Sequence, residues 1–129
     1  MKTISGLKNL ADINYTMIRI KRVYEKPTKN DGRRILVDRL WPRGLTKQKA
    51  AIDMWLKDIG PSTELRKWFG HDPKRWTTFQ VKYRRELKSK TDLLAELKRL
   101  GKKGMVTLVY GAKDMEHNEA LTLKTILEK

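Results

Sequence analysis

The residues best suited to chemistry lie in two segments of the 129-residue chain, and the first of them follows a short apolar run at residues 35–37. It carries Arg39, Trp41 and Arg43 into a turn marked by a proline and a glycine. Arginine side chains bind phosphate or carboxylate through paired hydrogen bonds. Ligands of α/β proteins collect beyond the carboxyl ends of the strands. We therefore interpret this segment as the floor and lip of a binding site.

The second segment lies where the final predicted helix begins, directly after a buried strand. Asp114 is expected to cap this helix, and His117 and Asn118 follow it. Free N–H groups and the helix dipole favour an anion at such a position. His117 is the candidate catalytic residue, because histidine can act as acid or base near neutral pH. The alternative is that Asp114 only caps the helix while His117 and Asn118 face solvent.

Together the two segments predict one pocket for an anionic small molecule. The expected ligand-binding residues are Arg39, Trp41, Arg43, Arg66, His71, Tyr110, Asp114 and Asn118. Structural roles are the alternative for several of them. Arg39 and Arg43 could form a buried ion pair with Asp38 or Glu64. The tryptophans at positions 41 and 68 fit packing better than ligand stacking, and a histidine beside a capping aspartate, as at His71, is usually structural.

The chain is strongly basic, with 30 Lys and Arg against 15 Asp and Glu and a formal net charge of +15. Residues 17–49 hold 11 basic residues against 3 acidic ones, and residues 66–103 hold 13 against 4. Such an uneven field attracts polyanions, although a lysine-rich soluble surface is an equally good explanation. The corresponding alternative function is a non-catalytic nucleic-acid-binding module that uses the basic helix residues Lys74, Arg75, Lys82, Arg84, Arg85 and Lys88.

Composition excludes several other classes of protein. The chain has no cysteine, which excludes disulfides, thiolate nucleophiles and cysteine-based zinc sites. Its two histidines lie far apart, so we expect neither a metal site nor a cofactor. No run of about 18 apolar residues could span a membrane, and the first 16 residues lack the apolar stretch of a secretory signal. We expect a cytoplasmic protein with a loose leader at residues 1–16 and a single domain at residues 17–129.

Hydrophobic patterning and turn residues predict the elements that position these groups. Strands are predicted at residues 17–24, 34–40 and 105–110. Helical segments are predicted at residues 47–50, 63–69, from 73 onward, at 92–100, where glycines at 101 and 104 would end the helix, and at 115–127. Residues 51–59 fit either a strand or a helix, and we prefer the strand. The alternation predicts an α/β fold, a single domain with a mainly parallel sheet covered by helices, as a three-layer or an open two-layer sandwich.

Four segments carry a resemblance to a known family. They are residues 18–25, 37–44, 61–73 and 110–118, and the most specific pieces are Trp-Pro-Arg-Gly and Trp-Phe-Gly-His-Asp. Over residues 17–127 the chain resembles the YeaO-like branch of the family called domain of unknown function 488. The resemblance implies a small bacterial or archaeal α/β domain without an established activity. Whether the protein is an enzyme therefore stays open.

One departure from the wider family limits what the resemblance implies. Many members carry a Cys-His-Arg triplet at the last strand–helix turn, where this chain has Asn118, Glu119 and Ala120. A thiolate mechanism cannot be carried over to a chain without cysteine. Our first hypothesis is a domain that binds a phosphate-bearing, nucleotide-like ligand at the strand C-terminal edge and acts on it through Arg39, Arg43 and His117. Nucleic-acid binding is the second hypothesis, and a non-catalytic partner-binding protein is the third.

Overall fold

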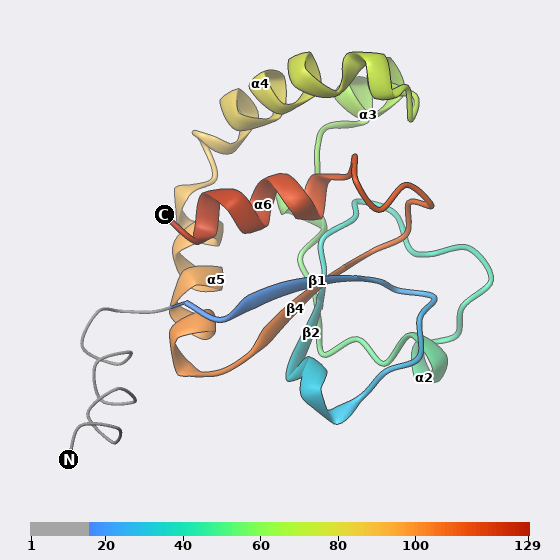
Figure 1. Ribbon diagram of the computed structural model, residues 1–129, viewed down its shortest axis with the longest axis vertical. Helices are drawn as coiled ribbons and strands as arrows, with labels where there is room; N and C mark the ends of the chain where they lie inside the picture. Colours follow the sequence, from blue (N-terminus) through green and yellow to red (C-terminus); the bar gives the residue numbers. More distant parts are fainter. Residues whose placement is uncertain (1–15) are drawn as a thin grey trace.

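The computed structural model of the chain describes residues 16–129, so the predicted leader lies outside the described residues except for Thr16. A parallel sheet of four strands forms its centre (Figure 1). Its order is β1-β4-β2-β3, and every neighbouring pair is parallel. The strands are β1 (Ile18–Arg22), β2 (Arg33–Leu36), β3 (Met54–Trp55) and β4 (Val106–Tyr110). All four carboxyl ends therefore meet at one edge of the sheet, and the predicted α/β fold is confirmed.

The helices cover the two faces of the sheet unequally. They are α2 (Lys47–Ala50), α3 (Thr63–Phe69), α4 (Trp76–Leu87), α5 (Thr91–Lys103) and α6 (Glu119–Leu127), with the 3-10 turns η1 (Lys29–Asp31), η2 (Lys57–Ile59) and η3 (Pro73–Arg75). The main core contains residues from four helices, α3, α4, α5 and α6, and from one face of the sheet. Helix α6 lies between α4 and the strands (Figure 1). A smaller cluster around Leu36, Ala50 and Val109 covers the other face. The arrangement is thus the open two-layer form of the predicted sandwich.

Several predicted helix boundaries are confirmed because local side chains set them. The Thr46 side chain accepts a hydrogen bond from the Lys49 amide at the start of α2. Ser62 does the same for the Leu65 amide, and Gly70, in the left-handed region at φ 53°, ends α3. These side chains satisfy backbone groups that a helix end leaves unpaired, so sequence alone could locate them.

Helix α4 has one buried face. Its inward residues Phe79, Tyr83 and Leu87 are each no more than 2% exposed. The Tyr83 hydroxyl donates to the carbonyl of Ile59 at 2.7 Å, so the buried polar atom is satisfied. Burial of each such side chain contributes about 1.5–3 kcal/mol to stability. These three residues anchor α4 in the main core.

Other boundaries differ from the sequence-based prediction. Strand β2 ends at Leu36, four residues early. The preferred strand within residues 51–59 exists, but β3 has only two residues before η2 begins. Helix α5 continues through Gly101 to Lys103. A Cβ at Gly101 would lie 2.7 Å from Cγ2 of Thr16, so this glycine permits close packing and does not end the helix. The start of α6, which also differs, is described with the site.

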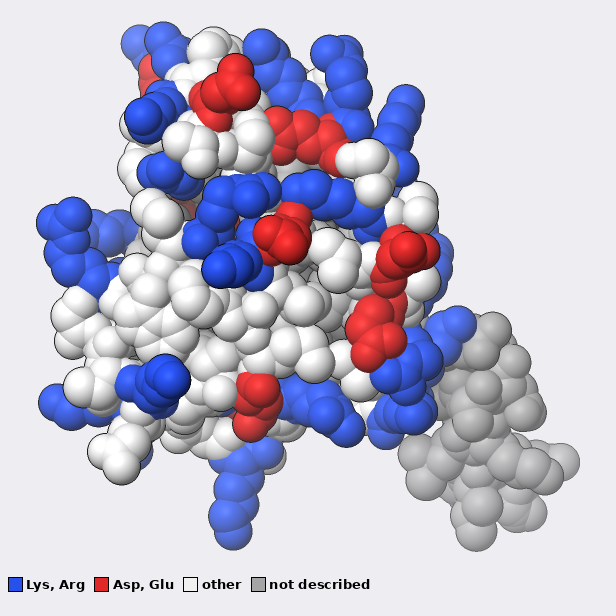
Figure 2. All heavy atoms as spheres, turned by 180° about the vertical axis from the view of Figure 1, so that it is seen from behind, with Lys and Arg blue, Asp and Glu red and all other residues white. Residues whose placement is uncertain are grey.

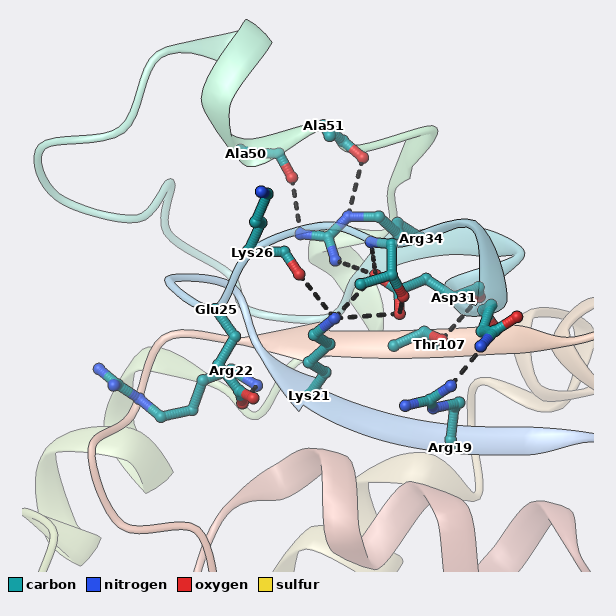
Figure 3. A network of polar contacts seen from close by, with 12 residues as sticks. Arg19, Lys21, Arg22, Glu25, Lys26, Asp31, Arg34, Ala50, Ala51 and Thr107 are labelled. Carbon is teal, nitrogen blue, oxygen red and sulfur yellow. Dashed lines mark hydrogen bonds and ion pairs between the residues drawn. The ribbon is translucent and has the colours of Figure 1, made fainter.

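A buried network of charged side chains lies on the sheet face opposite to the large helices (Figure 3). The Asp31 carboxylate accepts hydrogen bonds from Lys21 at 3.1 Å and from Arg34 at 2.8 Å. Arg34 also donates to the carbonyls of Ala50 and Ala51, which fixes the end of α2. Burial by itself raises the pKa of Asp31, but the hydrogen bonds from Thr28, Lys21 and Arg34 outweigh it and hold the pKa well below its usual range. Part of the basic sequence excess is therefore internal.

Replacing Asp31 by Asn should destabilise the fold strongly. The change leaves Arg34, whose side chain is 4% exposed, without its counter-charge. Breaking a buried pair in this way costs about 3–5 kcal/mol of unfolding free energy. Urea denaturation measures the loss. The control is Glu96→Gln, which removes a carboxylate from a solvent-exposed pair with Arg99 and should leave the midpoint nearly unchanged. Equal midpoint shifts for both variants would contradict the assignment.

Candidate functional site

A cavity of about 250 Å³ lies at the edge of the sheet where the strands end. Its walls come from the segments that follow β1, β2 and β4, from the start of α6, and from α3 and α4. The arginine-bearing segment after β2 and the residues before α6 are more than 70 positions apart in sequence. The parallel register of β2 and β4 pairs Leu36 with Val109 and so brings the continuations of both strands together. The two predicted segments therefore line one cavity.

Most of the sequence-predicted site residues lie in the cavity wall. Those that do are Arg39, Trp41, Arg43, Arg66, His71, His117 and Asn118. Within residues 16–129, Tyr110 and Asp114 are not part of the wall. Tyr110 is buried in the core, and this burial raises the pKa of its hydroxyl. Asp114 contacts the side chain of His117, which is part of the wall.

Arg39 serves mainly to anchor a loop. Its Nε donates to the carbonyl of Pro61 at 3.0 Å, and its Nη2 donates to the carbonyl of Gly60 at 2.9 Å. The carboxylate within ion-pair distance is that of Asp58, at 4.0 Å. Neither of the partners expected for a buried ion pair, Asp38 or Glu64, takes this position among the described residues. Arg39 thus shapes the cavity wall by tying the 58–61 segment to the end of β2.

Arg66 and Arg43 are the cavity-lining arginines with capacity for a ligand. The Nε of Arg66 is buried and has no hydrogen-bond partner in the described part of the chain. A buried donor without a partner costs about 1–3 kcal/mol. Arg43 is exposed at the rim, where its backbone carbonyl accepts a hydrogen bond from the Tyr24 hydroxyl at 2.8 Å. An anion in the cavity could satisfy Arg66 while Arg43 closes over it from outside.

His117 is held in one orientation by Asp114. Its Nδ1 lies 2.7 Å from Oδ2 of Asp114, and its ring packs edge-on against Trp76 with centroids 5.4 Å apart. The amide of Glu116 and the His117 ring lower the pKa of the Asp114 carboxyl, because both favour its charged form. With Nδ1 engaged, Nε2 is the ring nitrogen available to a ligand. This is the arrangement of an oriented acid, base or hydrogen-bond donor.

The start of α6 corrects the predicted cap. Helix α6 begins at Glu119, and Asn118 is its cap: the Asn118 side chain accepts from the Leu121 amide at 3.0 Å. Its Nδ2 donates to the carbonyl of Asp114 at 3.1 Å. Asp114 caps no helix and instead organises the preceding turn by accepting from the amides of Glu116 and His117. Asn118 is only 2% exposed, so both ends of its amide serve the backbone.

Trp41 and His71, both predicted to bind the ligand, have different surroundings. Trp41 donates from Nε1 to the carbonyl of Leu45 at 2.7 Å and packs edge-on against Trp55, with ring centroids 5.4 Å apart. It therefore carries a packing role at the cavity lip. His71 is exposed, has a left-handed backbone at φ 57°, and lies 6.4 Å from the ring of Phe69. His71 is consequently a rim residue with a free approach from solvent.

Sequence reasoning missed two acidic residues in the wall, Asp38 and Glu119. Oδ2 of Asp38 accepts a hydrogen bond from the amide of Gly111 at 2.8 Å. Burial, followed by the negative charge of Asp38, raises the pKa of Glu119 well above its usual value. The available sequence signals were weak. An acid after a strand is often solvated, and a glutamate after a helix cap usually just complements the helix dipole.

Neither a metal cluster nor a membrane span is visible in the described residues. Residues 16–129 contain no group of three or more His, Asp or Glu side chains arranged to hold a metal ion. In the same range, every helix is too short or too polar to cross a membrane.

Comparison with known proteins identifies relatives along nearly the whole chain. Residues 17–129 match the family model described as the inactive DUF488-N3 subclade. The uncharacterized protein YeaO of Escherichia coli (strain K12) is 46% identical over 106 residues, which are 82% of this chain and 92% of YeaO. The uncharacterized protein Rv3073c of Mycobacterium tuberculosis (strain ATCC 25618 / H37Rv) is 38% identical over 115 residues, 89% of this chain and 97% of its own length. No solved structure matches the chain.

Replacing Glu119 by Gln should change the pH dependence of stability. The raised pKa means that the folded protein keeps a proton that the unfolded chain releases near its ordinary value of 4.5. The free energy of unfolding therefore falls as the pH rises from that value through the raised pKa. Glutamine cannot ionise, so the variant should gain stability relative to the parent between pH 5 and pH 8. Urea midpoints at the two pH values measure this gain.

Glu116→Gln is the matched control for this prediction. Glu116 lies three residues before Glu119 and is exposed. Its replacement should shift the midpoint by a similar small amount at both pH values. A Glu119→Gln effect that is likewise independent of pH would show that the Glu119 carboxyl titrates normally.

Proposed function

Because the chain belongs to the DUF488 family and its N3 subclade described as inactive, we propose that it binds a phosphate-bearing, nucleotide-like ligand in the cavity without transforming it. The binding site is the strand C-terminal edge. The ligand's phosphate lies between Arg66 and Arg43, and His117 donates to it from Nε2. A catalytic role of His117 as acid or base stays a prediction. We retain the cytoplasm as the proposed location, on the basis of the cysteine-free sequence.

The unpartnered Nε of Arg66 is the observation that carries this proposal. Buried polar groups in proteins are nearly always hydrogen-bonded, and exceptions call for an explanation. An oxygen of a bound phosphate supplies the missing acceptor, and a charge-assisted bond of this kind is stronger than a neutral one. The cavity volume of about 250 Å³ is just below the range of roughly 300–1,000 Å³ typical of small-molecule sites, which favours a compact ligand.

The environment of Asn118 supports binding without covalent chemistry. This residue stands where many members of the wider family carry cysteine. Its amide is buried and fully engaged with the Leu121 amide and the Asp114 carbonyl. A position that supplies a nucleophile must present it to the ligand with a base nearby. In this chain the same position secures the start of α6 instead.

Replacing Arg66 by Ala should weaken the binding of ribose 5-phosphate and of nucleoside monophosphates by about tenfold or more, because a charge-assisted bond of about 1.5–3 kcal/mol is lost. Calorimetric titration measures the affinity. Lys67→Ala is the matched control, since it removes one positive charge from the neighbouring exposed position of α3 and lies outside the cavity wall. Equal losses of affinity in both variants would show that only the overall positive charge matters and that Arg66 makes no specific contact. Absence of binding by the parent protein would refute the proposal.

Nucleic-acid binding is the alternative proposal, and the placement of the basic helix residues supports it. Lys74, Arg75, Lys82, Arg85 and Lys88 are exposed, and Arg84 is half-buried. Figure 2 shows Lys and Arg gathered over the part of the molecule where Figure 1 places α3 and α4. The ring of Trp68 is not free to stack on a nucleic-acid base, because Arg75 and Lys82 already lie over it, at 5.3 and 4.6 Å from its centroid.

The salt dependence of binding tests this alternative. A duplex contacted through these residues should bind with an affinity that falls steeply with salt, because phosphate contacts release counterions. The double variant Lys82→Ala/Lys88→Ala should reduce the slope of log affinity against log salt by about two. Lys47→Ala/Lys49→Ala, on the exposed face of α2, removes the same charge elsewhere as a control. An unchanged slope in the α4 variant would reject this surface.

A further inference from the structure

One aromatic ring of the cavity wall is open to solvent, and its meaning rests on the proposed function. Apart from the histidines, the wall formed by the described chain has four aromatic side chains, those of Tyr24, Trp41, Phe69 and Phe79. Phe69 and Phe79 are buried in the core, and Trp41 is half-buried against Trp55. Tyr24 is 42% exposed. Its ring is therefore the one that a flat ligand group in the cavity could cover.

The Tyr24 side chain is held at both ends. It lies in the turn after β1, which two hydrogen bonds close: the Arg22 amide donates to Oε2 of Glu25 at 3.0 Å, and the Glu25 amide donates to the Arg22 carbonyl at 3.1 Å. At the far end of the ring, the Tyr24 hydroxyl donates to the carbonyl of Arg43 at 2.8 Å. A ring ordered in advance loses little conformational freedom when a ligand covers it.

A cation lies over one face of this ring. The guanidinium carbon of Arg22 is 5.1 Å from the Tyr24 ring centroid, and the Arg22 Nε donates to the carbonyl of Ala112 at 2.9 Å. The wall, as far as residues 16–129 form it, includes Tyr24 but not Arg22. The ring surface that lines the cavity is therefore not the face that Arg22 covers. Arg22 supports the ring from behind and leaves the cavity side free.

The surroundings of Tyr24 combine apolar surface with a phosphate-binding residue. Leu40 also lines the wall and is 57% exposed. Exposed apolar side chains grouped at a cavity are typical of a ligand-binding surface. The hydroxyl bond to Arg43 places the ring next to an arginine that we assign to the phosphate. A phosphate alone would leave the Tyr24 ring and Leu40 uncovered, so a ligand that uses the whole wall has a flat apolar part beside its phosphate.

We propose that Tyr24 is the platform on which the aromatic base of a nucleotide stacks while the cavity arginines hold its phosphate. The ligand class is then nucleoside monophosphates, and sugar phosphates without a base bind more weakly. Stacking on an aromatic side chain tolerates different bases, because every base has a π-face. The site therefore recognises the presence of a base and not its identity.

Calorimetric titration of the parent protein tests the ligand class. AMP, GMP, CMP and UMP should each bind about tenfold or more tightly than ribose 5-phosphate, because a stacked base adds to the affinity. Equal affinities for ribose 5-phosphate and the four nucleotides would overturn the inference. A single nucleotide bound about tenfold more tightly than the other three would also overturn it, because the base edges would then be read.

Two variants of Tyr24 separate the ring from the hydroxyl. Tyr24→Phe and Tyr24→Leu both lose the bond to the Arg43 carbonyl, but only Tyr24→Leu loses the ring. The preference for AMP over ribose 5-phosphate should persist in Tyr24→Phe and fall by about tenfold in Tyr24→Leu. If Tyr24→Leu weakens both ligands equally, Tyr24 only holds the Arg43 segment, and the inference fails.

A measurement on the parent protein covers the case in which Tyr24→Leu does not fold. Proton NMR of the AMP complex should show the Tyr24 ring resonances shifted upfield by the ring current of the stacked base, and ribose 5-phosphate should cause no such shift. Equal spectra with both ligands would overturn the assignment to Tyr24.

The outcomes also separate this inference from the proposed function. Arg66→Ala should weaken ribose 5-phosphate and the nucleotides by the same factor and preserve the preference for a base. If ribose 5-phosphate binds as tightly as the nucleotides and Arg66→Ala weakens them all, the proposed function stands and the role of Tyr24 fails. If neither ribose 5-phosphate nor any nucleotide binds, the proposed function fails, and the inference falls with it.

Discussion

The hydrogen bond from the Gly111 amide to the Asp38 carboxylate holds the site together. Beyond Leu36 and Val109 the β2–β4 pairing continues only through a bond between Val37 and Val109, and both chains then leave the sheet. The Asp38 side chain replaces the missing strand pairing with a bond of its own. Without it, the arginine-bearing lip and the turn before α6 would have no direct polar connection at this point. The cavity exists because two strand ends diverge and one carboxylate spans the gap.

The basic residues of this protein form a buried group and an exposed group. Lys21 and Arg34 turn inward to Asp31, on the sheet face away from the large helices (Figure 3). Their hydrogen bonds join β1, η1, β2 and the end of α2, so they stabilise the fold and offer nothing to a ligand. Lys82 and Arg85 of α4 are exposed to solvent instead. A net charge of +15 thus overstates the positive surface available to partners.

The cavity combines features that would conflict in a simple anion site. Arg66 lacks a partner for a buried donor, and Asp38 lacks one for a buried acceptor. Both atoms belong to residues of the same wall, but they do not pair with each other. Holding unmatched groups apart costs stability, and proteins retain such costs mainly where a ligand repays them. Arg66 and Asp38 therefore differ from the two members of an ordinary buried ion pair, which satisfy each other.

The sequence by itself determined the family, the parallel α/β fold and those boundaries that nearby residues control. Ser62 and Gly70 delimit α3 because their hydrogen bonds and backbone angles are local. The tertiary structure decided between equivalent local options. Asp114 and Asn118 can both cap a helix; in the folded chain Asn118 caps α6, while Asp114 contacts the ring of His117. The raised pKa of the Glu119 carboxyl likewise depends on burial and on the charge of Asp38, which lies 81 positions earlier in the chain, and no local pattern predicts an interaction across that separation.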